Sequence, residues 1–206
     1  MSPKTVPALL AGVVLAACCV GCNEDAPFGV SQSQPDPEPA GYTDPAALLA
    51  AHTKALEHQD PALYEKLLDE NFEYFPQGAD LIDFPWLQGQ LSWSRADELQ
   101  MIAHMFDDNF APADPQAAGT VDRIDAAITI DSQQALPDGT YEVMSHATFL
   151  VMYTTYGNGA RADVRLEFRL VPAADGYLRI REIRELPSYQ RAVDPTNWAT
   201  IKNLYR

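Results

Sequence analysis

Five polar side chains in the second half of the chain have the types and spacing to line a binding pocket. Tyr141, Ser145 and Tyr153 share one face of a predicted strand, because side chains two apart point the same way. Arg181 and Glu185 stand in a later predicted strand. Hydroxyl groups donate and accept hydrogen bonds, and an inward Arg–Glu couple is either a mutual ion pair or a polar contact for a ligand. We expect these five residues to form a candidate pocket.

The same face of the first strand carries no carboxylate or histidine that could move a proton near neutral pH. Its other members are apolar: Val143, Ala147, Phe149 and Val151. His146 falls on the opposite face, as a partly exposed or dimer-interface residue. The spacings of a zinc-protease helix, a nucleophile elbow, a phosphate loop and a dinucleotide fingerprint do not occur in the sequence. We therefore predict no catalytic residue set, no metal and no cofactor.

An Asn-Gly pair predicts how two long strands, 141–155 and 161–171, form a hairpin. A two-residue loop at Asn158-Gly159 is the strongest short hairpin signal. It places apolar residues opposite one another on the inward face, whereas a slip of one residue would place them opposite charges. The expected pairs are Tyr153 with Val164, Val151 with Leu166, Phe149 with Phe168 and Ala147 with Leu170.

A second turn, Asp175-Gly176, leads into a strand over 177–186. Its register predicts two favourable cross-strand charge pairs, Arg169 with Glu182 and Glu167 with Arg184. The same register turns both Arg181 and Glu185 inward. The apolar residues of this strand change parity along it, from Leu178 and Ile180 to Ile183, which indicates a β-bulge that would return one of the two charges to solvent.

Helices precede these strands and one follows them. Asp44-Pro45 and Asp60-Pro61 each combine an N-cap residue with proline at the first helical position. Ser94 with Asp97 approximates a capping box before a third helix. The predicted apolar faces are Leu48, Leu49, His52, Ala55 and Leu56 in the first helix, Leu63, Tyr64, Leu67, Leu68 and Phe72 in the second, and Leu99, Ile102, Ala103 and Phe106 in the third. A short terminal helix after Asp194-Pro195 carries Trp198, Ile201, Leu204 and Tyr205. Residues 72–75 have a composition typical of a β-strand. From Ile124 onward apolar and polar residues alternate, as they do in a half-buried strand.

This order predicts an α+β domain: a curved antiparallel β-sheet packed by N-terminal helices into a cone-like shape, with a short C-terminal helix. Over residues 44–206 the chain resembles the nuclear transport factor 2-like (cystatin-like cone) superfamily. The local features are Ala55 to Asp60 leading into Tyr64 to Leu68, and the closing segment from Trp198 to Lys202. The superfamily contains isomerases, dehydratases and non-catalytic binding domains, and many such domains occur as bacterial lipoproteins.

The start of the chain predicts a location. A basic residue and a short apolar run over 5–17 are typical of a secretory signal peptide, and the run is too short to span a bilayer. Leu15-Ala16-Ala17-Cys18 resembles the bacterial lipobox, which makes residues 1–17 the signal peptide and Cys18 the lipidated residue. Cys22 is the alternative, because lipidation there would leave no unmodified thiol in the mature chain. Neither candidate is followed by aspartate, which favours the outer membrane with the domain in the periplasm.

Residues 18–43 are rich in Pro, Ser, Gln and acidic residues, so we expect a disordered tether between the lipid and the domain. A chain of that length spans about 25 Å. The domain over 44–206 contains no cysteine, so apolar burial must stabilise it without disulfides.

A formal net charge of −15 makes nucleic-acid binding improbable, because phosphate backbones are repelled. Three hypotheses follow. The main one is an envelope-anchored, non-catalytic domain that binds a small apolar ligand or a protein. The second is a cone-fold isomerase, dehydratase or cyclase. The third is a homodimer through the sheet, since Met144, Leu150, Met152 and Val171 share its outer face.

Overall fold

The computed structural model describes residues 40–112, 119–154, 159–187 and 197–206. The predicted signal peptide, both candidate cysteines and most of the tether lie outside them. The helices are α1 Pro45–Glu57, α2 Pro61–Leu67, α3 Arg95–Met105 and α4 Trp198–Asn203, with 3-10 turns η1 Gly78–Asp83 and η2 Pro85–Leu87. The strands are β1 Leu68–Phe75, β2 Trp93–Ser94, β3 Val121–Ala135, β4 Tyr141–Tyr153, β5 Gly159–Pro172 and β6 Leu178–Leu186.

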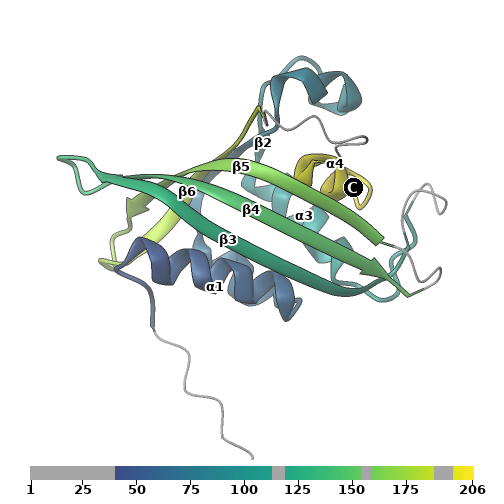
Figure 1. Ribbon diagram of the computed structural model, residues 1–206, viewed down its shortest axis with the longest axis horizontal. Coiled ribbons are helices and arrows are strands. Elements are labelled where there is room, and N and C mark those ends of the chain that lie inside the picture. The colour runs from purple at the N-terminus through teal and green to yellow at the C-terminus, as the bar shows by residue number, and fades with distance from the viewer. Residues whose placement is uncertain (1–39, 113–118, 155–158, 188–196) are drawn as a thin grey trace, which may run out of the picture. The chain divides into compact units, whose positions relative to one another are not determined.

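One curved, unclosed sheet organises the domain, and Figure 1 shows its long strands β3, β4 and β5 side by side. The strand order is β2-β1-β6-β5-β4-β3. All neighbours pair antiparallel except β1 and β6, which are parallel. The predicted α+β class is therefore confirmed, while the sheet is mixed rather than wholly antiparallel. The sequence of β1 gave no indication of its partner, because that partner comes more than 100 residues later.

The predicted helix starts are confirmed at three places. Asp44 caps α1 through Ala47 N at 2.9 Å, and Asp60 caps α2 through Leu63 N at 2.9 Å. Ser94 and Asp97 form a complete capping box on α3. Helix α2 nevertheless ends before the predicted stripe does. The Asp69 side chain accepts a bond from Asn71 N, and such local bonds compete with helical ones.

Helix α3 buries a different face from the predicted one. Ile102 is buried as expected, but Ala103 is exposed, and Leu99 and Phe106 are only partly buried. The buried stripe is Glu98, Met101, Ile102 and Met105. Leu99 and Phe106 still pack partly against the core, so the prediction was wrong for Ala103 and omitted Glu98, Met101 and Met105.

The β4–β5 hairpin keeps the predicted faces but not the predicted register. Val164 lies opposite Ala147 rather than Tyr153, a displacement of six residues. An even displacement leaves every side chain on its expected face. Phe149 now lies opposite Ala162, and the small neighbour leaves room for the indole of Trp198, which stacks on Phe149 at 4.3 Å. Packing has overridden the local turn signal, and Asn158 itself lies outside the described residues.

The β5–β6 predictions are confirmed. Glu167 pairs with Arg184 and Arg169 with Glu182, and the register shifts at Leu170, which pairs with Ile180. This is the bulge that the change of parity indicated.

Packing also begins slightly ahead of residue 44, the expected start of the domain. The Tyr42 carbonyl accepts a bond from Leu178 N at 2.7 Å. No helix in the described ranges is long and apolar enough to cross a bilayer.

Candidate functional site

The three predicted pocket residues of β4 lie on the inward face, as their parity required. Ser145 is fully buried and Tyr153 nearly so, while Tyr141 is half-buried. The Ser145 hydroxyl donates to the Leu166 carbonyl at 3.3 Å, so it serves the sheet itself. Burial raises the pKa of Tyr153 above its usual value.

The bulge separates the two predicted charges. Arg181 lies outward, and its Nε donates to Asp69 Oδ1 at 2.6 Å. Glu185 remains inward and buried, as Leu166 opposite it requires. Glu185 Oε1 accepts bonds from the Tyr74 hydroxyl and from Ala199 N. The two residues therefore do not form a pair, and Glu185 instead joins β6 to β1 and α4.

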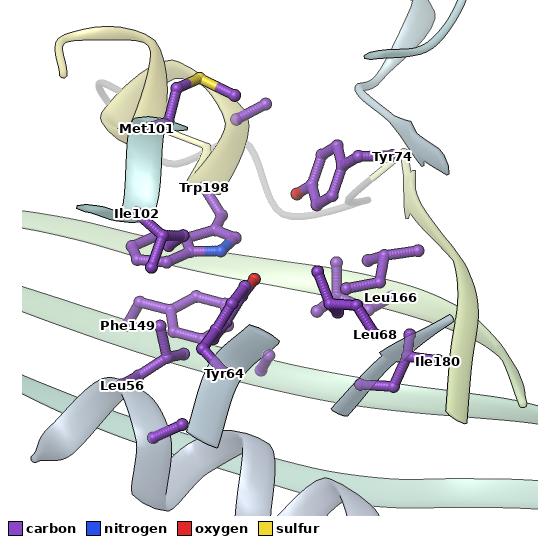
Figure 2. Close-up of a cluster of buried hydrophobic side chains, with 14 of the residues drawn as sticks. Leu56, Tyr64, Leu68, Tyr74, Met101, Ile102, Phe149, Leu166, Ile180 and Trp198 are labelled. Atoms are coloured by element: carbon purple, nitrogen blue, oxygen red, sulfur yellow. The ribbon is translucent and has the colours of Figure 1, made fainter. Parts of the chain in front are cut away.

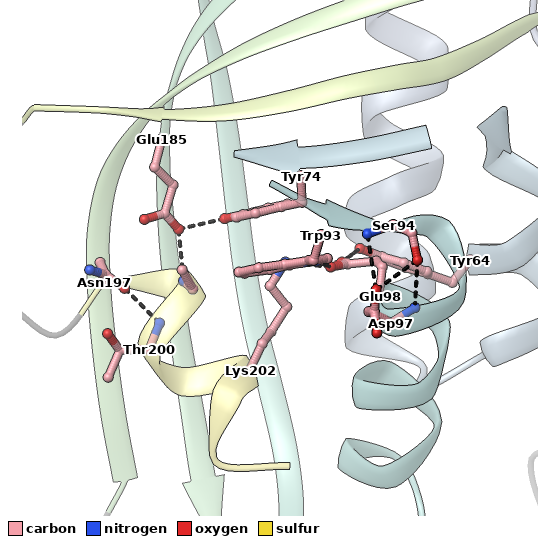
Figure 3. A network of polar contacts seen from close by, with 11 residues as sticks. Tyr64, Tyr74, Trp93, Ser94, Asp97, Glu98, Glu185, Asn197, Thr200 and Lys202 are labelled. Carbon is pink, nitrogen blue, oxygen red and sulfur yellow. Dashed lines mark hydrogen bonds and ion pairs between the residues drawn. The ribbon is translucent and has the colours of Figure 1, made fainter. Parts of the chain in front are cut away.

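A buried ion pair that sequence reasoning missed lies at the centre of the polar network in Figure 3. Lys202 Nζ on α4 donates to both oxygens of Glu98 on α3, at 3.0 and 2.9 Å. Both side chains are 0% exposed. A buried carboxylate and ammonium are tolerated only when each is paired and hydrogen-bonded.

Glu98 is also held by two neutral donors. The Tyr64 hydroxyl donates to Oε1 at 2.6 Å, and Trp93 Nε1 donates to Oε2 at 2.7 Å. Each carboxylate oxygen thus accepts two hydrogen bonds, one from Lys202 and one from a neutral donor. Together the three donor side chains come from three elements, α2, β2 and α4. Burial and the nearby Glu98 charge raise the pKa of Tyr64, which keeps this hydroxyl a donor.

Aromatic rings surround the Lys202 ammonium. Its Nζ lies 3.3 Å from the ring centre of Tyr74, 4.9 Å from Trp93 and 5.8 Å from Trp198. Tyr74 and Trp93 stack with centres 4.4 Å apart. Ring faces attract cations, so the three rings form a cage around the ammonium group, and the Glu98 carboxylate supplies its counter-charge. Burial lowers the pKa of Lys202, and Glu98 opposes that shift.

His52 on α1 is the remaining buried ionisable group near this network. It is 1% exposed, and neither ring nitrogen has a hydrogen-bond partner. Its ring lies 5.1 Å from Tyr64 and 6.1 Å from Phe168. Burial, followed by the charge of Lys202, lowers its pKa to about 3. His52 is therefore neutral at physiological pH and packs as an aromatic residue.

Buried apolar side chains from the sheet and the helices meet between them, and Figure 2 shows part of this cluster. Phe149, Phe168, Trp93 and Trp198 are each at most 2% exposed. Trp198 enters from α4 and covers Phe149. Among the described residues, the buried carboxylates of this interior are bonded to protein groups: Glu98 to Lys202, and Glu185 to Tyr74 and Ala199.

A signal for the ion pair does exist in the sequence. Glu98 stands at helical spacing with Met101, Ile102 and Met105, and Lys202 with Trp198 and Tyr205. Opposite charges on the apolar stripes of two helices must be paired if both stripes are buried.

Comparison with known proteins decides the fold. No protein-family model and no curated protein sequence matches the chain. A conserved protein from Planctomyces limnophilus superposes with a TM-score of 0.50 at 10% sequence identity. The superposition covers 68% of this chain and 94% of the Planctomyces chain. A candidate scytalone dehydratase from Novosphingobium aromaticivorans also gives 0.50, at 12% identity, covering 74% and 88%.

The chain has a nuclear transport factor 2-like cone fold. At these identities the similarity shows the fold alone. The α+β cone expected from the order of elements is thus confirmed, and what this cone does must be argued from its own side chains.

Two open hollows lie on the outside of the cone. One of about 660 Å³ extends along β1 and the start of α3, and one of about 480 Å³ adjoins the β5–β6 turn. Glu70 and Arg181 line both. Both hollows are lined by carboxylates and arginines together, so neither is complementary to a purely anionic or a purely cationic ligand. No group of three possible metal ligands occurs in the part of the chain that the structure describes.

The outer face of the sheet differs in charge from the rest of this acidic chain. On β4, β5 and β6 it carries four carboxylates, Glu142, Asp163, Glu167 and Glu182, and five arginines, Arg161, Arg165, Arg169, Arg179 and Arg184, besides Arg181 at the bulge. Arg184 contacts Glu182 at 2.7 Å, and Arg161 contacts Asp163 at 2.8 Å. Met144, Leu150, Met152 and Val171 lie among them, half-buried.

Proposed function

We propose that the chain is a non-catalytic binding domain, tethered to the cell envelope by its N-terminus, and that the outer face of its sheet binds a second copy. One observation carries the first part. The cone interior is occupied by Phe149, Phe168, Trp93 and Trp198, and its Glu98 and Lys202 charges are bonded to each other. A substrate would have to displace these side chains before any chemistry could begin.

Charge balance favours a second copy as the occupant of the sheet face. Two copies of a chain of net charge −15 repel one another over most of their surfaces. On the outer face at least five arginines are interspersed with four carboxylates, so arginines of one copy can lie opposite carboxylates of the other. A two-fold dimer requires a self-complementary patch of this kind.

The apolar residues of the same face supply the burial that association needs. Leu150 adjoins a hollow of about 220 Å³ lined by Ala127, Thr148 and Arg161. A side chain of the second copy would enter this hollow and lose its contact with water. Fully burying a leucine contributes about 1.5–3 kcal/mol.

Sedimentation velocity of the unlipidated chain at micromolar concentration tests this proposal. We expect a dimer, and we expect Leu150→Asp to give a monomer because a buried unpaired charge is costly. Leu91→Asp is the matched control, since Leu91 is 66% exposed and lies outside the sheet face. A clean monomer for the unsubstituted chain contradicts the dimer.

The envelope location rests on the leader sequence. Metabolic labelling with a radioactive fatty acid should mark the mature protein, and Cys18→Ser should abolish the label. Loss of label with Cys22→Ser but not with Cys18→Ser would move the anchor to the alternative cysteine. Absence of label in the unsubstituted protein contradicts lipidation.

A cone-fold isomerase, dehydratase or cyclase acting on a small apolar substrate is the second candidate. The similar structure from Novosphingobium, described as a candidate scytalone dehydratase, favours it. This function would require α4 to move out of the cone, since its Trp198 and Lys202 side chains occupy the interior. Turnover of such a substrate that Tyr153→Phe abolishes without unfolding the domain would replace the non-catalytic proposal.

A further inference from the structure

We propose that Glu98, Tyr64, Tyr74 and Trp93 form a binding site for a small organic ammonium group, and that Lys202 occupies this site as an intramolecular ligand. The proposal concerns the interior of the cone and is independent of association through the sheet.

The site is assembled from elements other than the one that fills it. Tyr64 belongs to α2, Tyr74 to β1, Trp93 to β2 and Glu98 to α3. Two of the bonds to the carboxylate, from Tyr64 and Trp93 at 2.6 and 2.7 Å, come from neutral donors and do not involve Lys202. Binding sites of this kind gain affinity from such preorganisation, because no side chain must be ordered when the ligand arrives.

The chemistry of the site selects a compact ammonium. A carboxylate supplies the charge, and the stacked faces of Tyr74 and Trp93 attract a cation that is shielded from water. The Lys202 ammonium satisfies both requirements at once, at 2.9–3.0 Å from Glu98 and 3.3 Å from the Tyr74 ring centre. An alkylammonium ion repeats the end of a lysine side chain and would make the same contacts. A neutral alcohol of equal size would leave the carboxylate without its counter-charge.

Helix α4 brings Lys202 to the site and is itself held by packing and hydrogen bonds. Trp198 stacks on Phe149, Ala199 N donates to Glu185, and Asn203 accepts a bond from Trp86. A ligand that enters must compete with this helix. Its apparent affinity for the intact chain is therefore reduced by the fraction of molecules in which the site is open.

Titration of n-propylammonium, with n-propanol as the neutral comparison at equal ionic strength, tests the proposal. We expect Lys202→Ala to bind the ammonium about tenfold or more tightly than the unsubstituted chain does, because the competing side chain is gone. The double variant Glu98→Gln/Lys202→Ala should lose this binding. Lys54→Ala, which removes an exposed lysine of α1, should behave as the unsubstituted chain.

Equal binding of propanol and propylammonium by folded Lys202→Ala, or no binding of either, overturns the proposal. If Lys202→Ala does not fold alone, recovery of its circular dichroism by propylammonium but not by propanol supports the site, and failure of selective recovery overturns it. In the unsubstituted chain, hydrogen exchange in residues 197–206 should become faster at saturating propylammonium. Unchanged exchange there contradicts displacement of Lys202.

Discussion

At the scale of single residues, Lys202 and Glu98 each carry a charge that water does not reach, so each depends on the other. Removing one partner of a buried pair typically costs about 3–5 kcal/mol, because the other is left uncompensated. We expect Lys202→Met to lower the free energy of unfolding by that amount in urea denaturation. Adding Glu98→Gln should recover part of the loss. Lys54→Met is the exposed control, and equal losses for the two lysine variants would contradict the account.

His52 gives the folded domain a dependence on pH with a definite sign. Its pKa is about 3 in the folded chain and ordinarily 6.5, so only the unfolded chain binds a proton between these values. The contribution of neutral His52 to the free energy of unfolding is then fully present above pH 6.5. As the pH drops below 6.5, the free energy of unfolding decreases by up to about 1.4 kcal/mol per pH unit. Urea titrations between pH 6.5 and about 5 should show this slope, and His52→Leu should remove it. His146→Leu, which changes an exposed histidine, should retain it; the same slope in all three proteins would refute the assignment.

At the scale of elements, the hairpin register is the feature on which sequence and structure disagree most. In a chain whose native cysteines are replaced by serine, Thr148→Cys with Asp163→Cys should form a disulfide, because these residues are direct cross-strand partners. Thr148→Cys with Arg169→Cys should not, although the sequence-predicted register would pair them. Mass spectrometry of the oxidised proteins distinguishes the two, and a disulfide only in the second would restore the Asn-Gly register.

The elements that the sequence predicted are those with a local cause. The caps at Asp44, Asp60 and Ser94 and the alternation of β4 depend on neighbouring residues, and the structure has all of them. The parity change in β6 likewise located its bulge, which sent Arg181 outward and left Glu185 inside. The parallel β1–β6 pairing and the Glu98–Lys202 pair join segments more than 100 residues apart, so a local pattern can place each charge on an apolar stripe but cannot identify its partner.

At the scale of the whole molecule, the chain combines an expected tether with a cone whose interior is occupied by its own C-terminal helix. Figure 2 shows Trp198 and Phe149 together in that interior, and the buried Glu98 and Lys202 are paired with each other. What remains for partners is the outside, where the sheet face combines arginines, carboxylates and half-buried apolar side chains. The account therefore assigns association with a second copy to the surface, while the interior contains the Glu98 site that Lys202 occupies.

Acrylamide quenching of tryptophan fluorescence tests the filled cone most directly. In Trp86→Phe the remaining indoles, Trp93 and Trp198, are 1% and 2% exposed, and both lie inside the cone. We predict a Stern–Volmer constant several-fold below that of free tryptophan in the same buffer, since a neutral quencher must touch the ring. A constant close to that of free tryptophan would mean an interior open to small molecules, and would contradict the non-catalytic account.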